Sequence, residues 1–199
     1  MNRRQEPEYW RSICVGQTIS LAYGDSTEKL QVDTIWRIIE AGGSAEYILV
    51  NLDLDNQFVL VRIIGKRITV YALRIDPTFS MGDRQDMIDR DNFWIFEPPE
   101  DKDNYDLLNL RFTEALDPMD VEFVWRRNSV GEIEGPCEQL PSNGTENLLA
   151  TLTQYHCDDN MCPTPDIVVL EIGDARSSRG GTIQILHGEK INPESVSIL

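Results

Sequence analysis

The amino-acid sequence predicts an α+β protein that is mostly β, in which an antiparallel meander forms a small barrel or a rolled sheet beside two or three short helices. Three observations support this prediction. Short apolar segments follow one another between residues 15 and 75, they are rich in β-branched residues, and polar or glycine turns separate them. Consecutive short strands joined by such turns are typical of antiparallel sheets that close or roll up.

Five strands are expected in the first 75 residues. Their segments are VGQTISLAY, KLQVDTIWRII, EYILVNL, FVLVRII and RITVYALRI. In the third segment, side-chain alternation places Tyr47 and Leu49 on one face of the sheet. It places Ile48 and every second residue after it on the other face. Several strands are apolar on both faces, so we expect a covering layer over the outer face, supplied by the later part of the chain.

Two helices are expected in the second half of the chain. The first lies within residues 80–93, where Ser80 or Asp83 can cap it. The second lies within residues 141–156, where Thr145 can cap it and one helical face collects Leu148, Leu149, Leu152 and Tyr155. These two segments are the main short helices of the predicted fold class.

Further strands are expected after residue 120. Residues 121–127 predict a strand that turns at Asn128–Ser129 and pairs back on the following residues. Residues 166–174 form the clearest late strand, because they alternate and are rich in Val and Ile. Residues 182–191 predict a final hairpin that turns at His187–Gly188.

The chain is expected to fold as a single domain that spans residues 1–199. A chain of this length buries enough surface to form a core without disulfides or metals. The alternative is a division into a β-meander of residues 1–76 and an α+β part of residues 77–199, because the run of strands ends at Asp76–Pro77.

Net negative charge is the strongest global property of the sequence. Asp and Glu total 34 against 18 Lys and Arg, which gives a formal net charge of −16 at pH 7. A field of this sign repels phosphate backbones and anionic membrane surfaces, so direct binding to nucleic acid is not expected. The charge is explained either by an acidic, solubilising surface or by a docking surface for a basic protein partner.

A cytoplasmic location is expected from two absences. No stretch approaches the ~18 consecutive apolar residues of a membrane span. Residues 1–10 begin with basic residues, but the apolar run of a signal peptide does not follow them. In that compartment the four cysteines, Cys14, Cys137, Cys157 and Cys162, are expected to be reduced thiols.

Residues 76–120 combine aromatic side chains with concentrated negative charge. They contain thirteen acidic and four basic residues, a net charge of −9. Aromatic residues rimmed by acids are typical of a hot spot for a basic partner. The simpler alternative is that the aromatic side chains alternate on a strand and fill the core. The predicted partner-binding surface consists of Trp94, Phe96, Glu97, Glu100, Asp101, Asp103 and Asp106.

The segment YHCDDNMC, residues 155–162, contains residue types that bind metals. Cys157 and Cys162 have a spacing found in structural zinc sites, and His156 adjoins Cys157. Zinc needs about four ligands, however, and the sequence contains no second pair at a suitable spacing. The pattern favours a polar connection between a helix and a strand, without a metal or another cofactor. A zinc site and a Cys157–Cys162 disulfide stay open as alternatives.

The sequence contains no motif that predicts catalysis. It has no Gly-x-Ser-x-Gly elbow, no phosphate-binding loop and no His-Glu-x-x-His motif. We therefore expect a non-enzymatic interaction or accessory module that binds a basic partner. One alternative is an inhibitor that mimics nucleic acid and occupies the DNA- or RNA-binding cleft of another protein. The other is an enzyme whose site is assembled from distant residues.

The segment WRII…SAEYILVNLDLDNQFVLVRI, Trp36 to Ile63, resembles a bacterial β-domain family of unknown function. Members of that family tend to show a Glu-Tyr-x-Leu strand followed by a hairpin, which corresponds here to Glu46–Leu49. The resemblance implies an accessory, non-enzymatic role in a bacterium, and it carries no catalytic residues.

Overall fold

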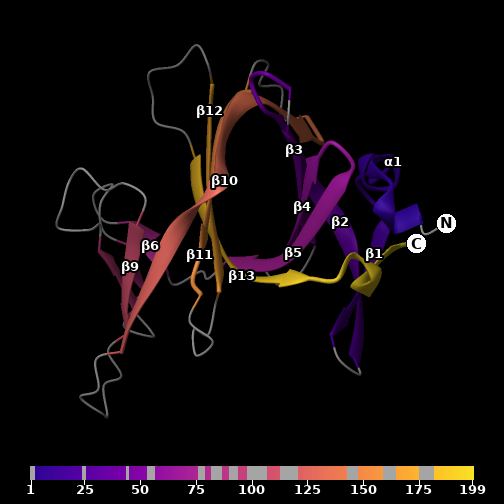
Figure 1. Ribbon diagram of the computed structural model, residues 1–199. Coiled ribbons are helices and arrows are strands. Elements are labelled where there is room, and N and C mark those ends of the chain that lie inside the picture. Colours follow the sequence, from indigo (N-terminus) through magenta and orange to yellow (C-terminus); the bar gives the residue numbers. More distant parts are fainter. Residues whose placement is uncertain are drawn as a thin grey trace.

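A closed ring of antiparallel strands forms the centre of the computed structural model (Figure 1). The structure describes residues 3–23, 26–43, 45–52, 57–75, 79–81, 87–89, 94–97, 107–112, 121–142, 148–158, 165–174 and 182–199. Between residues 79 and 133 it describes the strands without their side chains.

Eight strands make up the ring. In order around it they are β2 (Ser26–Ile39), β3 (Ala45–Leu52), β4 (Gln57–Ile64), β5 (Arg67–Ile75), β13 (Thr182–Ile191), β12 (Asp166–Asp174), β11 (Leu148–His156) and β10 (Val121–Leu140). The ring closes where β10 returns to β2, with Cys137 opposite Ile38, although its shape is not that of a regular barrel. The predicted fold class, mostly β with an antiparallel meander, is confirmed.

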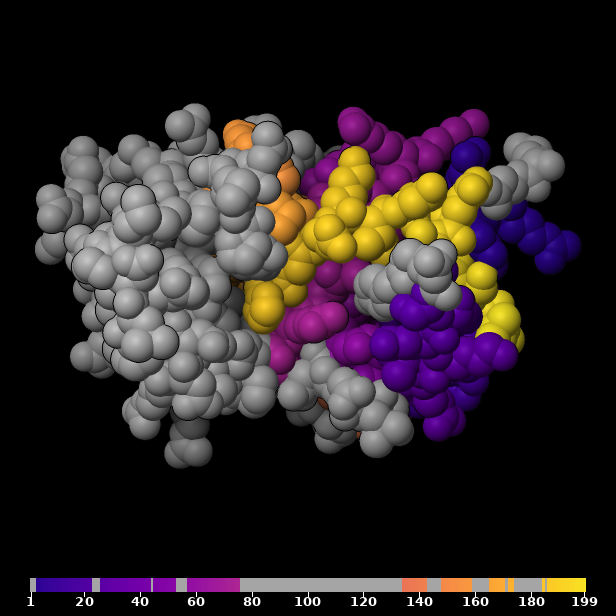
Figure 2. Space-filling model, turned by 90° about the horizontal axis from the view of Figure 1, so that it is seen from below, coloured from indigo at the N-terminus to yellow at the C-terminus, as the bar shows by residue number. Residues whose placement is uncertain are grey.

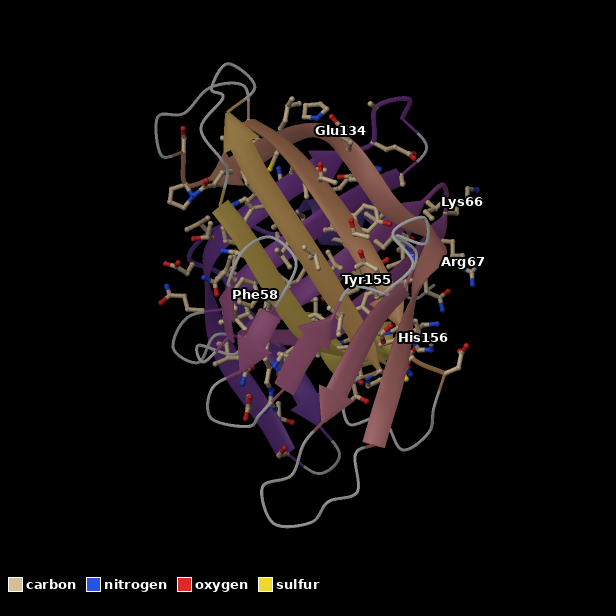
Figure 3. All side chains as sticks on the ribbon, turned by 90° about the vertical axis from the view of Figure 1, so that its left-hand side faces the viewer. Phe58, Lys66, Arg67, Glu134, Tyr155 and His156 are labelled. Atoms are coloured by element: carbon tan, nitrogen blue, oxygen red, sulfur yellow. The ribbon has the colours of Figure 1, made fainter. Side chains whose placement is uncertain are left out.

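Two extensions continue the sheet beyond the ring. On one side, β1 (Thr18–Tyr23) pairs with β2, and β14 (Val196–Ile198) pairs with β1. On the other side, the sheet continues from β10 through β9 (Leu107–Phe112), β8 (Trp94–Glu97), β7 (Met87–Asp89) and β6 (Phe79–Met81). Figures 1 and 3 show these four strands lying outside the ring, against the wall that contains β11 and β12.

Helical structure is sparse among the described residues. It consists of α1 (Pro7–Arg11) and two 3₁₀ turns, Arg3–Gln5 and Pro193–Ser195. None of these helices is long and apolar enough to cross a membrane.

Both predicted helices are wrong. Residues 148–156 form β11, in which Leu148, Ala150 and Leu152 are buried while Leu149 is 39% exposed. This burial has the two-residue period of a strand, and pairing with β10 and β12 overrides the helical spacing of the leucines. The segment 80–93 contains parts of β6 and all of β7, which pair with each other.

The predicted turns at Asn128–Ser129 and His187–Gly188 are also wrong, because β10 and β13 each continue through them. The pairing of β10 with β11 is irregular between Arg127 and Glu132, where residues 128–131 lie opposite Gln154 alone. β13 pairs with β12 along its first part and with β5 along its last part. Gly188 is required there for close approach, since an added Cβ would lie 2.1 Å from the carbonyl oxygen of Ala72.

Two apolar clusters pack against opposite faces of β2–β5. The inner cluster fills the ring and draws buried residues from all eight ring strands, with Trp36 stacked on Phe58 at 6.4 Å between ring centroids. The outer cluster includes Ile48 and Val50 of β3. Because Tyr47 and Leu49 belong to the inner cluster, the predicted alternation in β3 is confirmed.

The outer cluster is covered by the two ends of the chain, so the prediction that the later part supplies the cover is correct for β14 but omits the N-terminal segment. Trp10 and Ile13, in and just after α1, are fully buried there, together with Val196 of β14. Arg37 of β2 fixes this layer, since its Nη2 donates hydrogen bonds to the carbonyl oxygens of Arg11 and Ile13, both at 3.0 Å. Figure 2 shows both coloured ends of the chain on this side of the molecule.

Replacing Gly188 by alanine is expected to destabilise the fold, because the new methyl group would overlap the backbone of β5 at Ala72. The free energy of unfolding should fall by about 1–3 kcal/mol or more, as for other overpacked sites. Urea denaturation measures the change. The control is Glu189→Ala at the next, exposed position of β13, which should stay within about 0.5 kcal/mol of the wild type. Equal stability of Gly188→Ala and wild type would contradict the close approach of the two strands.

Candidate functional site

Polar side chains replace apolar ones at one end of the ring interior. Arg62 follows Leu60 in the inward-facing series of β4, and Gln154 follows Leu152 in that of β11. We call this group the polar cluster, and its members are Tyr47, Arg62, Tyr71, Gln154, His156 and Asp166. Figure 3 shows His156 at the same end of the ring as Lys66 and Arg67, while Phe58 lies toward the other end.

A hydrogen bond between Arg62 and Gln154 spans the ring. β4 and β11 are separated by three strands in either direction around the ring, and Nη1 of Arg62 donates to Oε1 of Gln154 at 3.0 Å. Gln154 is only 4% exposed, so its amide depends on protein partners for its hydrogen bonds. The guanidinium carbon of Arg62 also lies 6.0 Å from the ring centroid of Tyr71, within the range of cation–π attraction.

The groups that surround the charged guanidinium of Arg62 are neutral. Among the residues whose side chains the structure describes, no carboxylate lies within ion-pair distance of it. Tyr47 and Tyr71 both lie near Arg62, and the charge of Arg62 acts on both phenols. Burial raises the pKa of both phenols, although the nearby charge of Arg62 opposes the rise. Both hydroxyl groups therefore keep their protons at neutral pH and can donate hydrogen bonds.

A second part of the polar cluster orients His156. Its Nδ1 lies 2.8 Å from Oδ1 of Asp166, whose Oδ2 accepts a hydrogen bond from the backbone N–H of Lys190 at 3.1 Å. The Asp166 side chain is 10% exposed, whereas that of His156 is 48% exposed. A buried carboxylate with both oxygens engaged thus holds one edge of the imidazole, and the other edge faces outward.

The cysteines contribute no metal cluster to the part of the chain that the structure describes. Cys14, Cys137 and Cys157 form no disulfide with one another, and Cys162 lies outside the described residues, so the predicted alternatives that involve Cys162 stay open. Within the described ranges, no three side chains of His, Cys, Asp or Glu converge closely enough to hold a metal ion. The backbone N–H of Cys157 bonds to the carbonyl oxygen of Pro165 at 2.8 Å and closes the connection after β11.

The described part of the predicted partner-binding surface lies in the outer extension and not at the polar cluster. Trp94, Phe96 and Glu97 belong to β8, which pairs with β7 and β9. Their side chains are outside the description, as are the four remaining predicted residues, Glu100, Asp101, Asp103 and Asp106. The surface therefore stays a prediction, and so does the alternative in which the aromatic side chains fill a core.

The polar cluster is not predicted by the sequence patterns, apart from His156 as a metal candidate. A signal was present, since polar residues interrupt inward-facing apolar series at Arg62, Gln154 and Asp166. On β11 this signal cannot be recognised when the segment is interpreted as a helix, because the side chains of a helix do not alternate with a two-residue period.

Comparison of the chain with protein-family models, curated proteins and solved structures gave no match. The resemblance of Trp36–Ile63 to a bacterial β-domain family stays a prediction.

Replacing Gln154 by leucine is expected to destabilise the protein by about 1–3 kcal/mol, because Arg62 would lose its acceptor inside the ring. The double variant with Arg62→Met should lose less free energy of unfolding than the sum of the losses in the two single variants. The expected coupling energy is about 0.5–3 kcal/mol. Urea denaturation of the four proteins in this double-mutant cycle measures the coupling. The surface variant Gln31→Leu, which loses an exposed hydrogen bond to Gly16, is the control. Strict additivity would contradict a bond across the ring.

Cys137 is expected to resist thiol reagents in the folded protein. Burial, and secondarily the charge of Glu138, raises the pKa of its thiol to about 12, so the reactive thiolate is scarce below that pH. In a Cys162→Ser background at about pH 8, Cys14 should react first and Cys137 only after unfolding. Peptide mapping by mass spectrometry identifies the labelled residue. Rapid labelling of Cys137 in the native protein would contradict its position inside the ring.

Proposed function

We propose that this protein is a non-enzymatic accessory module that binds a basic protein partner through its acidic side. The observation that carries the proposal is the division of charge along the chain. Residues 1–75 contain nine acidic and nine basic residues and have no net charge. Residues 76–199 contain 25 acidic and nine basic residues and hold the whole net charge of −16.

This division of charge follows the architecture. Residues 1–75 form α1 and β1–β5, whereas the acidic remainder forms β6–β14 (Figure 1). Of the exposed carboxylates described in the acidic part, Glu138 approaches Arg37 at 3.7 Å, and Glu134 and Glu189 have no cationic partner among the described side chains. Negative charge concentrated in one part of the chain attracts a basic partner and accelerates association.

The interior of the ring gives further support to binding at the outer surface. Its apolar side chains form one continuous cluster between all eight strands, and the hydrogen bond from Arg62 to Gln154 crosses it at the polar end. Such a core stabilises the fold, so recognition of a partner falls to the exposed strands and loops.

Neutralising five acids of the predicted surface should weaken binding to the basic partner. The variant carries the amide counterpart of Glu97, Glu100, Asp101, Asp103 and Asp106. A matched variant removes five charges from the part of the chain without net charge, at Glu6, Asp25, Glu28, Asp33 and Asp53. A protein captured from the native host is purified, and its affinity for each variant is measured at about 0.05 M and about 0.5 M salt, because exposed charges are screened at the higher concentration.

The first variant should lose at least tenfold in affinity at low salt, while the matched variant keeps most of it. Trp94→Ala or Phe96→Ala should each cost a similar factor if the aromatic side chains anchor the partner. Binding that is insensitive to salt, or equal losses in the two charge variants, would contradict the proposal. Competition by duplex DNA for the captured protein would favour the nucleic-acid mimic instead.

A further inference from the structure

The guanidinium of Arg62 has hydrogen-bond donors that an ion from solvent can reach. The hydrogen bond to Gln154 occupies one of its five N–H groups. In the part of the chain that the structure describes, the fully buried side-chain atoms without a hydrogen-bond partner belong to Arg37, Gln57 and Gln184, and none belongs to Arg62. The N–H groups of Arg62 that have no protein partner are therefore accessible from solvent.

Two hydroxyl groups lie beside Arg62 on the inward face of β5. Thr69 is directly opposite Arg62 in the pairing of β4 with β5, and Tyr71 is the next inward-facing residue of β5. Each of these two residues is only 5% exposed. Hydrogen bonds in such a place, where the local dielectric is low, are stronger than in water. The two hydroxyl groups therefore add to the attraction of Arg62 for an anion.

Further basic residues lie at the same end of the ring. Lys66 and Arg67 lie at the turn between β4 and β5 and are exposed, and Figure 3 shows both at the end that carries His156. The charge of Arg67 acts on the phenol of Tyr71. Lys190 is directly opposite Tyr71 in the pairing of β5 with β13, and it is also exposed. Positive charge therefore gathers at one end of the ring, in a chain whose net charge is −16.

The carboxylate whose charge acts on Tyr71, that of Asp166, is engaged by other groups. Its Oδ1 lies 2.8 Å from Nδ1 of His156, and its Oδ2 accepts a hydrogen bond from the backbone N–H of Lys190. Asp166 forms its ion pair with His156 and none with Arg62 among the described side chains. The charge of Arg62 is therefore available to attract an anion from solvent.

We propose that this end of the ring binds a small molecule that carries a phosphate-type oxyanion. Arg62 is the inner contact, and the hydroxyl groups of Thr69 and Tyr71 donate from β5. Lys66 and Arg67 attract the anion at the rim. The planar guanidinium of arginine binds an oxyanion through two parallel hydrogen bonds, and a doubly charged group such as phosphate interacts with more than one cation.

The net charge of the chain favours a small ligand over a nucleic acid, because a field of this sign repels a long polyanion. The site is independent of the proposed partner-binding function, because none of its residues belongs to the predicted partner-binding surface.

Titration of the full-length protein with inorganic phosphate, followed by calorimetry at constant ionic strength, tests this site. We expect one saturable binding event per chain. Arg62→Gln should weaken it at least tenfold, because the charge and the guanidinium fork are both lost. Arg67→Gln at the rim should weaken it about threefold or more. The matched control is Arg74→Gln, which removes an exposed arginine from the other end of β5 and should leave the affinity unchanged.

The outcomes separate a built site from general attraction of phosphate to basic residues. Arg67 and Arg74 are exposed, so both variants should fold normally, and their thermal unfolding curves verify this. This pair keeps the test decisive even if Arg62→Gln does not fold. The proposal is overturned if phosphate at up to about 10 mM, enough to detect a Kd of about 1 mM, gives no saturable binding. It is also overturned if folded Arg62→Gln binds phosphate as the wild type does, or if Arg74→Gln weakens binding as much as Arg67→Gln does.

Discussion

The rest of the structure depends on one constraint, the pairing of β10 with β2 that closes the ring. β2 pairs with β1 along its first half and with β10 along Ile35–Ile38, while β3 occupies its other edge. β10, with 20 residues, is far longer than a typical strand of about 5–6 residues, and it pairs in turn with β9, β11 and β2. A long strand that changes partners allows one sheet to have both a closed interior and an open extension.

Closure also explains why polar groups can occupy the interior at one end. The bond from Arg62 to Gln154 joins strands on opposite sides of the ring, and it exists only when the circuit is complete. The same end carries the His156–Asp166 pair, supported by the backbone of β13. The apolar part of the interior therefore provides stability, while the chemically versatile groups gather where the ring meets solvent.

Much of the fold is predictable from local sequence, and the candidate site is not. The strands in residues 15–75 follow from alternation and turn residues. The segment of β11 predicts a helix from sequence alone, because the spacing of Leu148, Leu149 and Leu152 is compatible with a helix as well as with a strand. Only pairing with the neighbouring strands decides between the two. Gly188 suggests a turn in isolation, but its role is to let β13 approach Ala72. Arg62 and Gln154 are 92 residues apart, so no local pattern links them.

Amide hydrogen exchange in the native protein tests the closure of the ring most directly. If the ring is closed, amides in the seam, at Trp36–Ile38 of β2 and Cys137–Gln139 of β10, are protected as strongly as those in the β3–β4 pairing. Rapid exchange along β10 in the seam, with slow exchange retained in β3 and β4, would mean that the sheet is open there, and it would contradict the account.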